Sequence, residues 1–280
     1  GLVQYHQIRG ERYLRETTAL RLRLLDITVP SDPLTEAEMM PIRQGLYHLE
    51  TADRLGLIPT IGNASRRAWL SYMSGAPVEL GAAAERAIDL GENSGDMHHL
   101  LALEAVRGQD LEAARTRFEM AIDADPQRPE PYLNYGLLEA GAGNLSASET
   151  IFDRGMSAIE GHPEIAYNSG LAKALQGDSQ GAIARFNLVL ELDPEHLPAR
   201  ENLAGVLASL GRFAESEKHY YTAIQQSPED AETRFLLARV LAAQDDVDRA
   251  LDQLERALQL SPDMQKAIIM RGELEARRQP

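Results

Sequence analysis

The sequence predicts an all-α fold made of stacked helical hairpins. From Gly95 onward the residue pattern repeats every 34 positions, a period typical of stacked helix pairs. Proline-containing turns recur with the same period, at Asp125-Pro126, Asp193-Pro194, Ser227-Pro228 and Ser261-Pro262. Aromatic residues make up only 5% of the chain while alanine and leucine are abundant, which favours close helix packing over a β-sheet.

Five consecutive windows follow from the period: 95–128, 129–162, 163–196, 197–230 and 231–264. The eighth position of each window holds a small residue, namely Ala102, Gly136, Gly170, Ala204 and Ala238. The twenty-fourth position holds a bulky one, namely Phe118, Phe152, Phe186, Tyr220 and Leu254. Small residues facing bulky ones predict that the two helices of each hairpin approach closely.

Glycines mark the turn between the two helices of several hairpins. Gly143, Gly177 and Gly211 are expected to adopt a positive φ, which costs glycine little. Asp245 replaces glycine in the fifth window, and Gly108 comes one place early in the first. The second window lacks its closing proline, and Pro163 opens the next window instead.

The flanking segments follow the pattern less closely. Residues 61–94 predict a degenerate hairpin, and residues 1–60 a helical extension, with a helix over 35–57 interrupted near Pro41. The segment 19–29 alternates like a strand but is flanked by helical patterns, and we favour a helix. Residues 265–280 predict a capping helix with Ile268, Ile269 and Leu274 facing inward.

The matching positions resemble the tetratricopeptide repeat (TPR) family, from Gly95 to about Gly272. The resemblance implies a right-handed superhelix, an αα solenoid of about five to six hairpins with a C-terminal capping helix. It also implies a non-enzymatic scaffold that binds a peptide segment or partner protein in a concave groove lined by the first helix of each hairpin.

In the TPR family, window positions 2, 5, 6, 9, 12 and 13 tend to face the groove. Position six holds Asn134, Asn168 and Asn202, whose carboxamides are expected to pair with the backbone of an extended peptide. The alternative is that they only satisfy nearby backbone groups. Further groove contacts are expected from Leu133, Leu137, Tyr167, Leu171 and Phe235, and from Arg239 as a donor to a carboxylate. These apolar residues would otherwise pack between hairpins.

The fifth positions exclude one known kind of TPR groove. They hold His99, Leu133, Tyr167, Glu201 and Phe235, so no lysine is available for a two-carboxylate clamp. A clamp for acidic chaperone tails is therefore not expected. The neutral and apolar centre of the groove favours a peptide with hydrophobic anchors instead.

Composition and motifs argue against several other functions. A net charge of −15 disfavours nucleic acid and anionic membranes as partners, and no apolar stretch is long enough to insert in a membrane. The string Gly177-Asp178-Ser179 lies at a hairpin turn, and His98 and His99 lack a zinc-site pattern. We therefore predict no catalytic residue, no metal and no cofactor.

Two alternative functions remain open from the sequence. The chain lacks an initiator Met and opens with several arginines, which favours the soluble TPR portion of a larger membrane-anchored bacterial envelope enzyme or assembly factor that recruits its client. Periplasm or cell envelope is then expected over cytoplasm. The second alternative is a self-assembling scaffold, a homo-oligomer, in which the first 60 residues occupy a groove and bury Ile27, Val29, Leu34 and Ile42.

Overall fold

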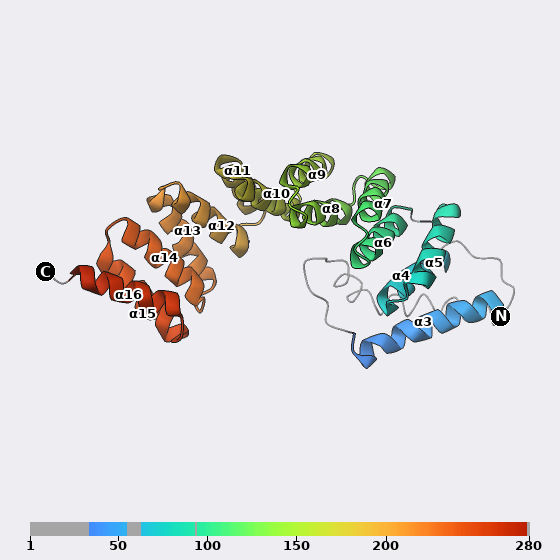
Figure 1. Ribbon diagram of the computed structural model, residues 1–280, viewed down its shortest axis with the longest axis horizontal. Helices are drawn as coiled ribbons and strands as arrows, with labels where there is room; N and C mark the ends of the chain where they lie inside the picture. Colours follow the sequence, from blue (N-terminus) through green and yellow to red (C-terminus); the bar gives the residue numbers. More distant parts are fainter. Residues whose placement is uncertain (1–33, 55–62, 93, 279–280) are drawn as a thin grey trace. The chain divides into compact units, whose positions relative to one another are not determined.

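The computed structural model describes residues 34–54, 63–92 and 94–278, and these residues form helices joined by short turns (Figure 1). The predicted all-α TPR fold is confirmed there. The helices are α3 (Glu36–Arg54), α4 (Asn63–Ser74), α5 (Pro77–Asp89), α6 (Ser94–Arg107), α7 (Leu111–Ala124), α8 (Pro129–Gly141), α9 (Leu145–Ala158), α10 (Pro163–Gln176), α11 (Ser179–Leu192), α12 (Leu197–Ser209), α13 (Phe213–Gln226), α14 (Ala231–Ala243), α15 (Val247–Leu260) and α16 (Gln265–Arg278). No helix among the described residues has the length and apolar character needed to cross a bilayer.

The chain divides into two units, which are considered one at a time. Unit 1 comprises residues 1–138 and 157–159, and unit 2 comprises residues 139–156 and 160–280. In unit 1, α4 pairs with α5 and α6 pairs with α7. In unit 2, the hairpins are α10 with α11, α12 with α13, and α14 with α15, followed by α16.

The long helix α3 runs through Pro41 without interruption, so the predicted break near this residue is wrong. Ile42 and Leu49 of α3 are buried against Leu70 and Met73 of α4. This burial offsets the backbone hydrogen bond that a proline removes inside a helix.

The packing of α3 also bears on the apolar residues near the N-terminus. Ile42 is fully buried and Leu34 packs against the same cluster, so both find burial within their own chain. Ile27, Val29 and the predicted helix over 19–29 lie outside the described residues.

In the hairpin of α10 and α11, a bulky side chain fits closely against a small residue. A Cβ atom added to Gly170 would lie 2.7 Å from the ring of Phe186, far inside normal contact distance. The bulky residues Phe118, Phe152, Phe186, Tyr220 and Leu254 are all buried. The close approach predicted from window positions 8 and 24 is therefore confirmed at Gly170.

The hairpin turns place one residue in the left-handed region of backbone space. Gly143, Gly177 and Gly211 have φ values of 81°, 82° and 73°, as expected. Asp245 adopts φ 59° in the window that lacks this glycine. In the first window the left-handed residue is Gln109, with φ 60°, because Gly108 comes one place too early to reach that position.

Neighbouring hairpins are joined by polar contacts between residues about one period apart. Arg117 pairs with Glu85 in unit 1, while Arg185 pairs with Asp153 and Arg249 with Glu217 in unit 2. The two partners of each pair are 32 positions apart in the sequence. An arginine–carboxylate pair at this spacing therefore recurs between neighbouring hairpins.

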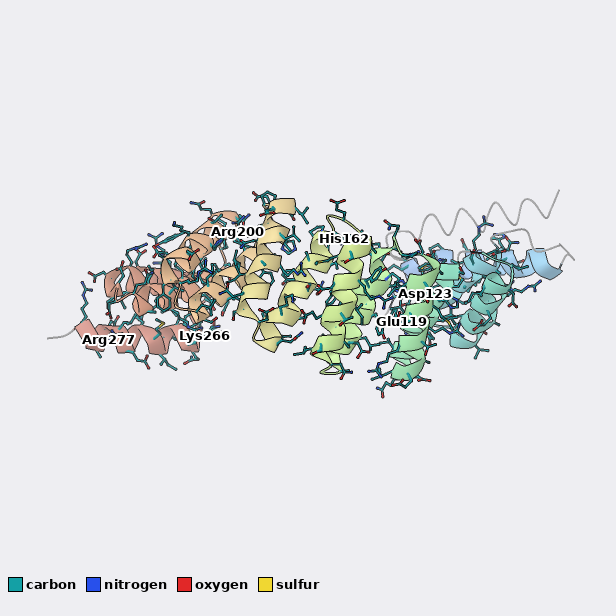
Figure 2. The ribbon with its side chains drawn as sticks, turned by 90° about the horizontal axis from the view of Figure 1, so that it is seen from above. Glu119, Asp123, His162, Arg200, Lys266 and Arg277 are labelled. Carbon is teal, nitrogen blue, oxygen red and sulfur yellow. The ribbon has the colours of Figure 1, made fainter. Side chains whose placement is uncertain are left out.

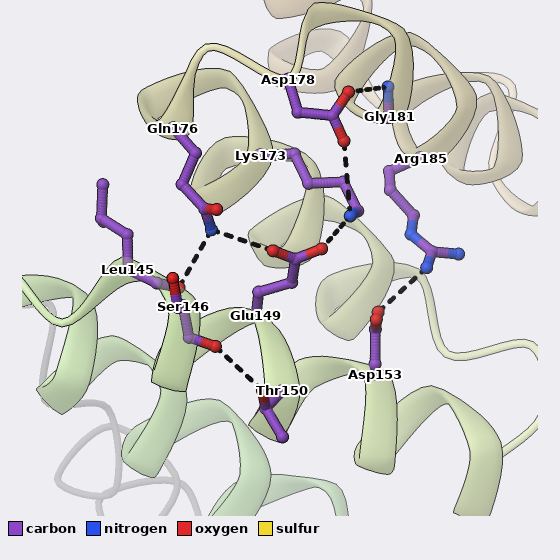
Figure 3. Close-up of polar contacts among 10 residues, drawn as sticks. All are labelled: Leu145, Ser146, Glu149, Thr150, Asp153, Lys173, Gln176, Asp178, Gly181 and Arg185. Atoms are coloured by element: carbon purple, nitrogen blue, oxygen red, sulfur yellow. Dashed lines mark hydrogen bonds and ion pairs between the residues drawn. The ribbon is translucent and has the colours of Figure 1, made fainter.

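The best-connected of these joints links α9, α10 and α11 within unit 2 (Figure 3). Glu149 of α9 accepts hydrogen bonds from Lys173 and Gln176 of α10. The Lys173 ammonium also lies 3.6 Å from Asp178, whose other carboxylate oxygen caps α11 by accepting from the Gly181 N–H. The bond from Lys173 holds the pKa of Glu149 below its usual value.

Helix α16 covers the last hairpin with Leu274 buried as predicted and Ile268 half-buried, but one predicted inward residue differs. Ala267 and Leu274, seven positions apart, are buried, whereas Ile269 is 59% exposed, so its predicted inward direction is wrong. On an α-helix, Ile269 is rotated about 200° from Ala267 and faces away from the shared contact. Gly272, the small residue at position eight of this helix, has open space around it.

Replacing Gly170 by valine tests the fit between small and bulky residues. We expect Gly170→Val to destabilise the chain by about 1–3 kcal/mol, because the new methyl groups would displace the buried Phe186 ring. Gly272→Val is a matched control at the same window position and should stay within about 0.5 kcal/mol of the parent. Urea unfolding followed by far-ultraviolet circular dichroism measures both, and equal midpoints for the two variants would contradict the packing argument.

Candidate functional site

The predicted groove residues of unit 2 lie on the first helix of each hairpin. We call their surface the first-helix face of unit 2. Its members come from α10, α12 and α14, and are Tyr167, Asn168, Leu171, Glu201, Asn202, Gly205, Ala208, Phe235, Leu236 and Arg239. Leu133, Asn134 and Leu137, the other predicted site residues, belong to unit 1.

A hydrogen bond between consecutive hairpins recurs at the fifth and sixth window positions. In unit 2, Asn202 Nδ2 donates to Tyr167 Oη over 3.0 Å and also to the Pro198 carbonyl of its own helix over 2.9 Å. The two side chains are 35 positions apart, one period plus one residue. Asn202 therefore ties α12 to α10 while remaining half-buried on the face.

In unit 1 the same window positions hold a buried pair. Asn134 Nδ2 lies 2.9 Å from His99 Nε2, and since an amide nitrogen only donates, the imidazole nitrogen accepts and the ring is neutral. Burial lowers the pKa of His99 to about 3. Asn134 is only 4% exposed, so a ligand would reach it only after unit 1 rearranges.

Asn168 bonds differently because its neighbour in the pattern is apolar. The residue 35 positions before it is Leu133, which has no polar side-chain atom. Asn168 Nδ2 instead donates to the Glu164 carbonyl of its own helix over 2.8 Å. Within the described chain, the carboxamide oxygens of Asn168 and Asn202 accept no hydrogen bond, so both remain available as acceptors on the face.

The predicted apolar contacts differ in how much of each side chain is accessible. Tyr167 and Leu171 are half-buried, as are Leu133 and Leu137 in unit 1. Phe235 is 7% exposed and belongs to the buried core of the last hairpins. Lys266 Nζ lies 4.9 Å from its ring centroid and the Arg239 guanidinium 6.0 Å from it. Lys266, near the start of α16 in Figure 2, also pairs with Glu232. The ligand contacts of the nine groove residues named in the sequence analysis stay predictions.

A hollow of about 270 Å³ lies on this face between α12, α13 and α14. Its walls are almost entirely apolar, and its lining residues are Gly205, Ala208, Ser209, Phe213, Tyr220, Leu236, Arg239, Val240 and Ala243. Six of these residues occupy groove positions of their windows. Leu236 is at position six, Gly205 and Arg239 are at position nine, Ala208 is at position twelve, and Ser209 and Ala243 are at position thirteen.

The ninth window position explains why the hollow is there. This position holds Leu103, Leu137 and Leu171 in the first three windows, and then Gly205 and Arg239. Without a side chain at Gly205, and with the Arg239 side chain exposed, the volume that a leucine would fill stays empty. The break in the leucine series is a sequence signal for this hollow, although Gly205 is not among the residues predicted to contact a ligand.

Three polar side chains border the mostly apolar hollow, and one of them, Ser209, donates its hydroxyl to the Val206 carbonyl. Tyr220 Oη lies next to Gly205, since a Cβ atom there would be 3.6 Å from it. Burial raises the pKa of Tyr220 to about 12, although the nearby positive charge of Arg239 acts in the opposite direction. In the part of the chain that the structure describes, Tyr220 Oη makes no hydrogen bond and Arg239 no ion pair.

The electrostatics elsewhere on the face are set by half-buried acids. Thr233 Oγ1 lies 2.6 Å from a Glu201 carboxylate oxygen and 2.7 Å from one of Asp230. Burial raises the pKa of Glu201, and the hydrogen bond from Thr233 opposes the rise. The described residues contain no group of three or more histidine, aspartate or glutamate side chains placed to hold a metal ion.

Comparison with known proteins identifies the family. Family models described as tetratricopeptide repeat match residues 99–163 and 196–263. Among solved structures, the C-terminal part of a TPR repeat-containing protein from Cytophaga hutchinsonii superposes with a TM-score of 0.71 at 16% identity, covering 81% of this chain and 93% of that one. Among curated proteins, none matches the sequence significantly.

Two further similar structures carry functional descriptions of their own. YrrB, described as a TPR protein with an unusual peptide-binding site, has a TM-score of 0.60 at 18% identity over 68% of this chain and 98% of its own. PilW, described as a type IV pilus biogenesis factor, has a TM-score of 0.58 at 16% identity over 76% and 99%. At these identities the likeness is one of fold. The chain is a tetratricopeptide repeat protein, and its fold is that of a protein-interaction scaffold.

The buried pair of His99 and Asn134 predicts a pH dependence of stability. The folded pKa of His99 lies below its unfolded value of about 6.5, so between pH 6.5 and 3 the unfolded chain binds more protons. Stability should therefore fall with decreasing pH in this window, by up to about 1.4 kcal/mol per pH unit from this group. Trp69, the single tryptophan, lies in the same core cluster as Phe118 and reports urea unfolding of unit 1 by fluorescence.

The control for this measurement is the double variant His99→Leu with Asn134→Leu, which removes both partners. It retains His98, whose pKa is also lowered, so the difference in slope isolates His99. Identical slopes for the parent and the double variant between pH 6.5 and 4 would exclude His99 as the cause.

Proposed function

We propose that the first-helix face of unit 2 binds an extended peptide segment of a partner protein. One observation carries the proposal: apolar side chains remain half-exposed at the predicted groove positions, beside carboxamides whose oxygens are free to accept. Tyr167, Leu171 and Leu236 are the half-exposed apolar residues, and Asn168 and Asn202 the carboxamides.

The chemistry of these groups suits an extended main chain. The free oxygens of Asn168 and Asn202 would accept from peptide N–H groups, an interaction that does not depend on the ligand's side chains. The half-exposed apolar residues would supply most of the affinity by removing apolar surface from water. The description of YrrB as a peptide-binding TPR protein agrees with this use of the fold.

The experiment starts from a peptide selected on the intact chain. A library of random twelve-residue peptides is panned against the protein, and the tightest binder is measured by fluorescence anisotropy. We expect the double variant Asn168→Ala with Asn202→Ala, and separately Leu171→Ala, each to raise the Kd about tenfold. A loss of that size corresponds to about 1.4 kcal/mol, which one or two hydrogen bonds or a half-buried leucine supply.

Leu192→Ala serves as the matched control, because Leu192 is an exposed leucine at the end of α11, a second helix. Its Kd should equal that of the parent, and all variants should keep the parent circular dichroism spectrum. The proposal fails if the selected peptides bind the Asn and Leu171 variants as tightly as the parent, or if Leu192→Ala alone weakens them.

Two other roles inferred from the sequence remain predictions. These are recruitment of a client in the bacterial envelope and self-assembly. Burial of Leu34 and Ile42 within unit 1 removes part of the reason to expect that the N-terminal segment needs a second chain.

A further inference from the structure

The hollow beside Gly205 combines an apolar wall with polar groups that are free to bind. Its walls are apolar, formed among others by Ala208, Leu236 and Val240. Its border carries an arginine without an ion pair and a tyrosine hydroxyl without a hydrogen bond among the described residues. A ligand that fits both features must present an apolar group and an anionic group close to each other.

We propose that this hollow receives the carboxyl-terminal residue of a peptide whose last side chain is apolar. The side chain would fill the space left by Gly205, and the terminal carboxylate would accept from the Arg239 guanidinium and from Tyr220 Oη. The inference rests on the proposed peptide-binding function and specifies which end of the peptide lies between α12 and α14.

The size of the hollow fits one such residue. A volume of about 270 Å³ corresponds to roughly nine water molecules, taking about 30 Å³ for each in the liquid. This is enough for a leucine-sized side chain together with its carboxylate, and too small for a folded element such as a partner helix. The leucines at position nine of three other windows show that a side chain of this size suits that place in the repeat.

Arg239 supplies a positive charge at the border of the hollow, against the negative charges of Glu201 and Glu232, which also act on Tyr220. The other cations of this region are already engaged: Lys266 pairs with Glu232, Arg234 bonds to the Pro228 carbonyl and Arg200 to Gln226. Arg239 makes a cation–π contact with Phe235, 6.0 Å from the ring centroid, and no ion pair among the described residues. Its fork of donors is therefore available for a bidentate contact with a carboxylate.

The test uses a minimal probe that carries both features, N-acetyl-L-leucine. Its binding to the intact chain is followed by ¹H–¹⁵N correlation spectra, through the amides of Gly205, Ala208 and Ala243. We expect saturable shifts with a Kd on the order of a few millimolar, the range typical of a ligand with about twelve heavy atoms. N-acetyl-L-leucinamide, which lacks the carboxylate, and N-acetylglycine, which lacks the side chain, should each bind at least fivefold more weakly.

Variants of the chain assign each part of the probe. Arg239→Gln and Tyr220→Phe should each weaken N-acetyl-L-leucine about five- to tenfold, and bring it close to the affinity of its amide, which they should hardly change. Gly205→Leu should abolish shifts from both leucine probes by filling the hollow. Ala243→Leu fills it from the rim and replaces this variant if Gly205→Leu does not fold.

Arg256→Gln is the matched control, since Arg256 is an exposed arginine on the second helix α15 and its loss changes the net charge equally. Its affinity for N-acetyl-L-leucine should equal that of the parent. Equal binding of N-acetyl-L-leucine and its amide would overturn the carboxylate contact, and equal binding of N-acetylglycine would overturn the apolar one. Absence of any saturable shift overturns the inference as a whole.

The two proposals fail in different ways. If selected peptides bind the Asn168 and Leu171 surface but the probe does not enter the hollow, the proposed function stands and this inference falls. If the probe binds and no selected peptide depends on Asn168, Asn202 or Leu171, the proposed function falls and the hollow remains a site for small apolar carboxylates.

Discussion

The close packing of the two helices of a hairpin, where a bulky side chain meets a small residue, is the constraint on which the structure depends. At Gly170 the Phe186 ring comes so close that even one added carbon atom would collide with it. Alanine takes the place of this glycine at Ala102, Ala204 and Ala238, which are all fully buried in the same core clusters as Phe118, Tyr220 and Leu254. Because the two helices meet there, the first helix presents a fixed set of positions to the outside, and the candidate site is built from that set.

Much of the fold could be predicted from the sequence because it follows from local, repeated patterns. The helices after Gly95, the glycine turns and the left-handed Asp245 all come from residues whose spacing repeats. The errors arise where the pattern stops. Pro41 is tolerated because α4 buries the residues around it. Ile269 faces solvent because Ala267, on the opposite side of α16, is the residue buried against the last hairpin. Both depend on tertiary contacts that no local pattern encodes.

The site was harder to predict, for two physical reasons. A carboxamide at position six has groups that can bond to the neighbouring hairpin or to a ligand, and the residue 35 positions earlier decides whether that hairpin offers a partner. His99 engages Asn134, Tyr167 engages Asn202, and Leu133 offers Asn168 no polar atom. A hollow, moreover, arises from a side chain that is absent. Gly205 is not one of the predicted site residues, yet its missing side chain leaves the hollow between α12, α13 and α14.

The polar contacts that join one hairpin to the next have a consequence for how such a chain changes in length. The two partners are 32 residues apart in arginine–carboxylate pairs such as Arg185–Asp153, and 35 residues apart in the Asn202–Tyr167 pair. Each contact therefore reaches only the adjacent hairpin. Stability is then a sum of single hairpins and of the interfaces between neighbours. Duplicating or deleting one complete 34-residue repeat in the gene would leave each remaining helix packed against the same type of helix as before. Evolution therefore has a route to longer or shorter ligand-binding surfaces that does not require a new fold.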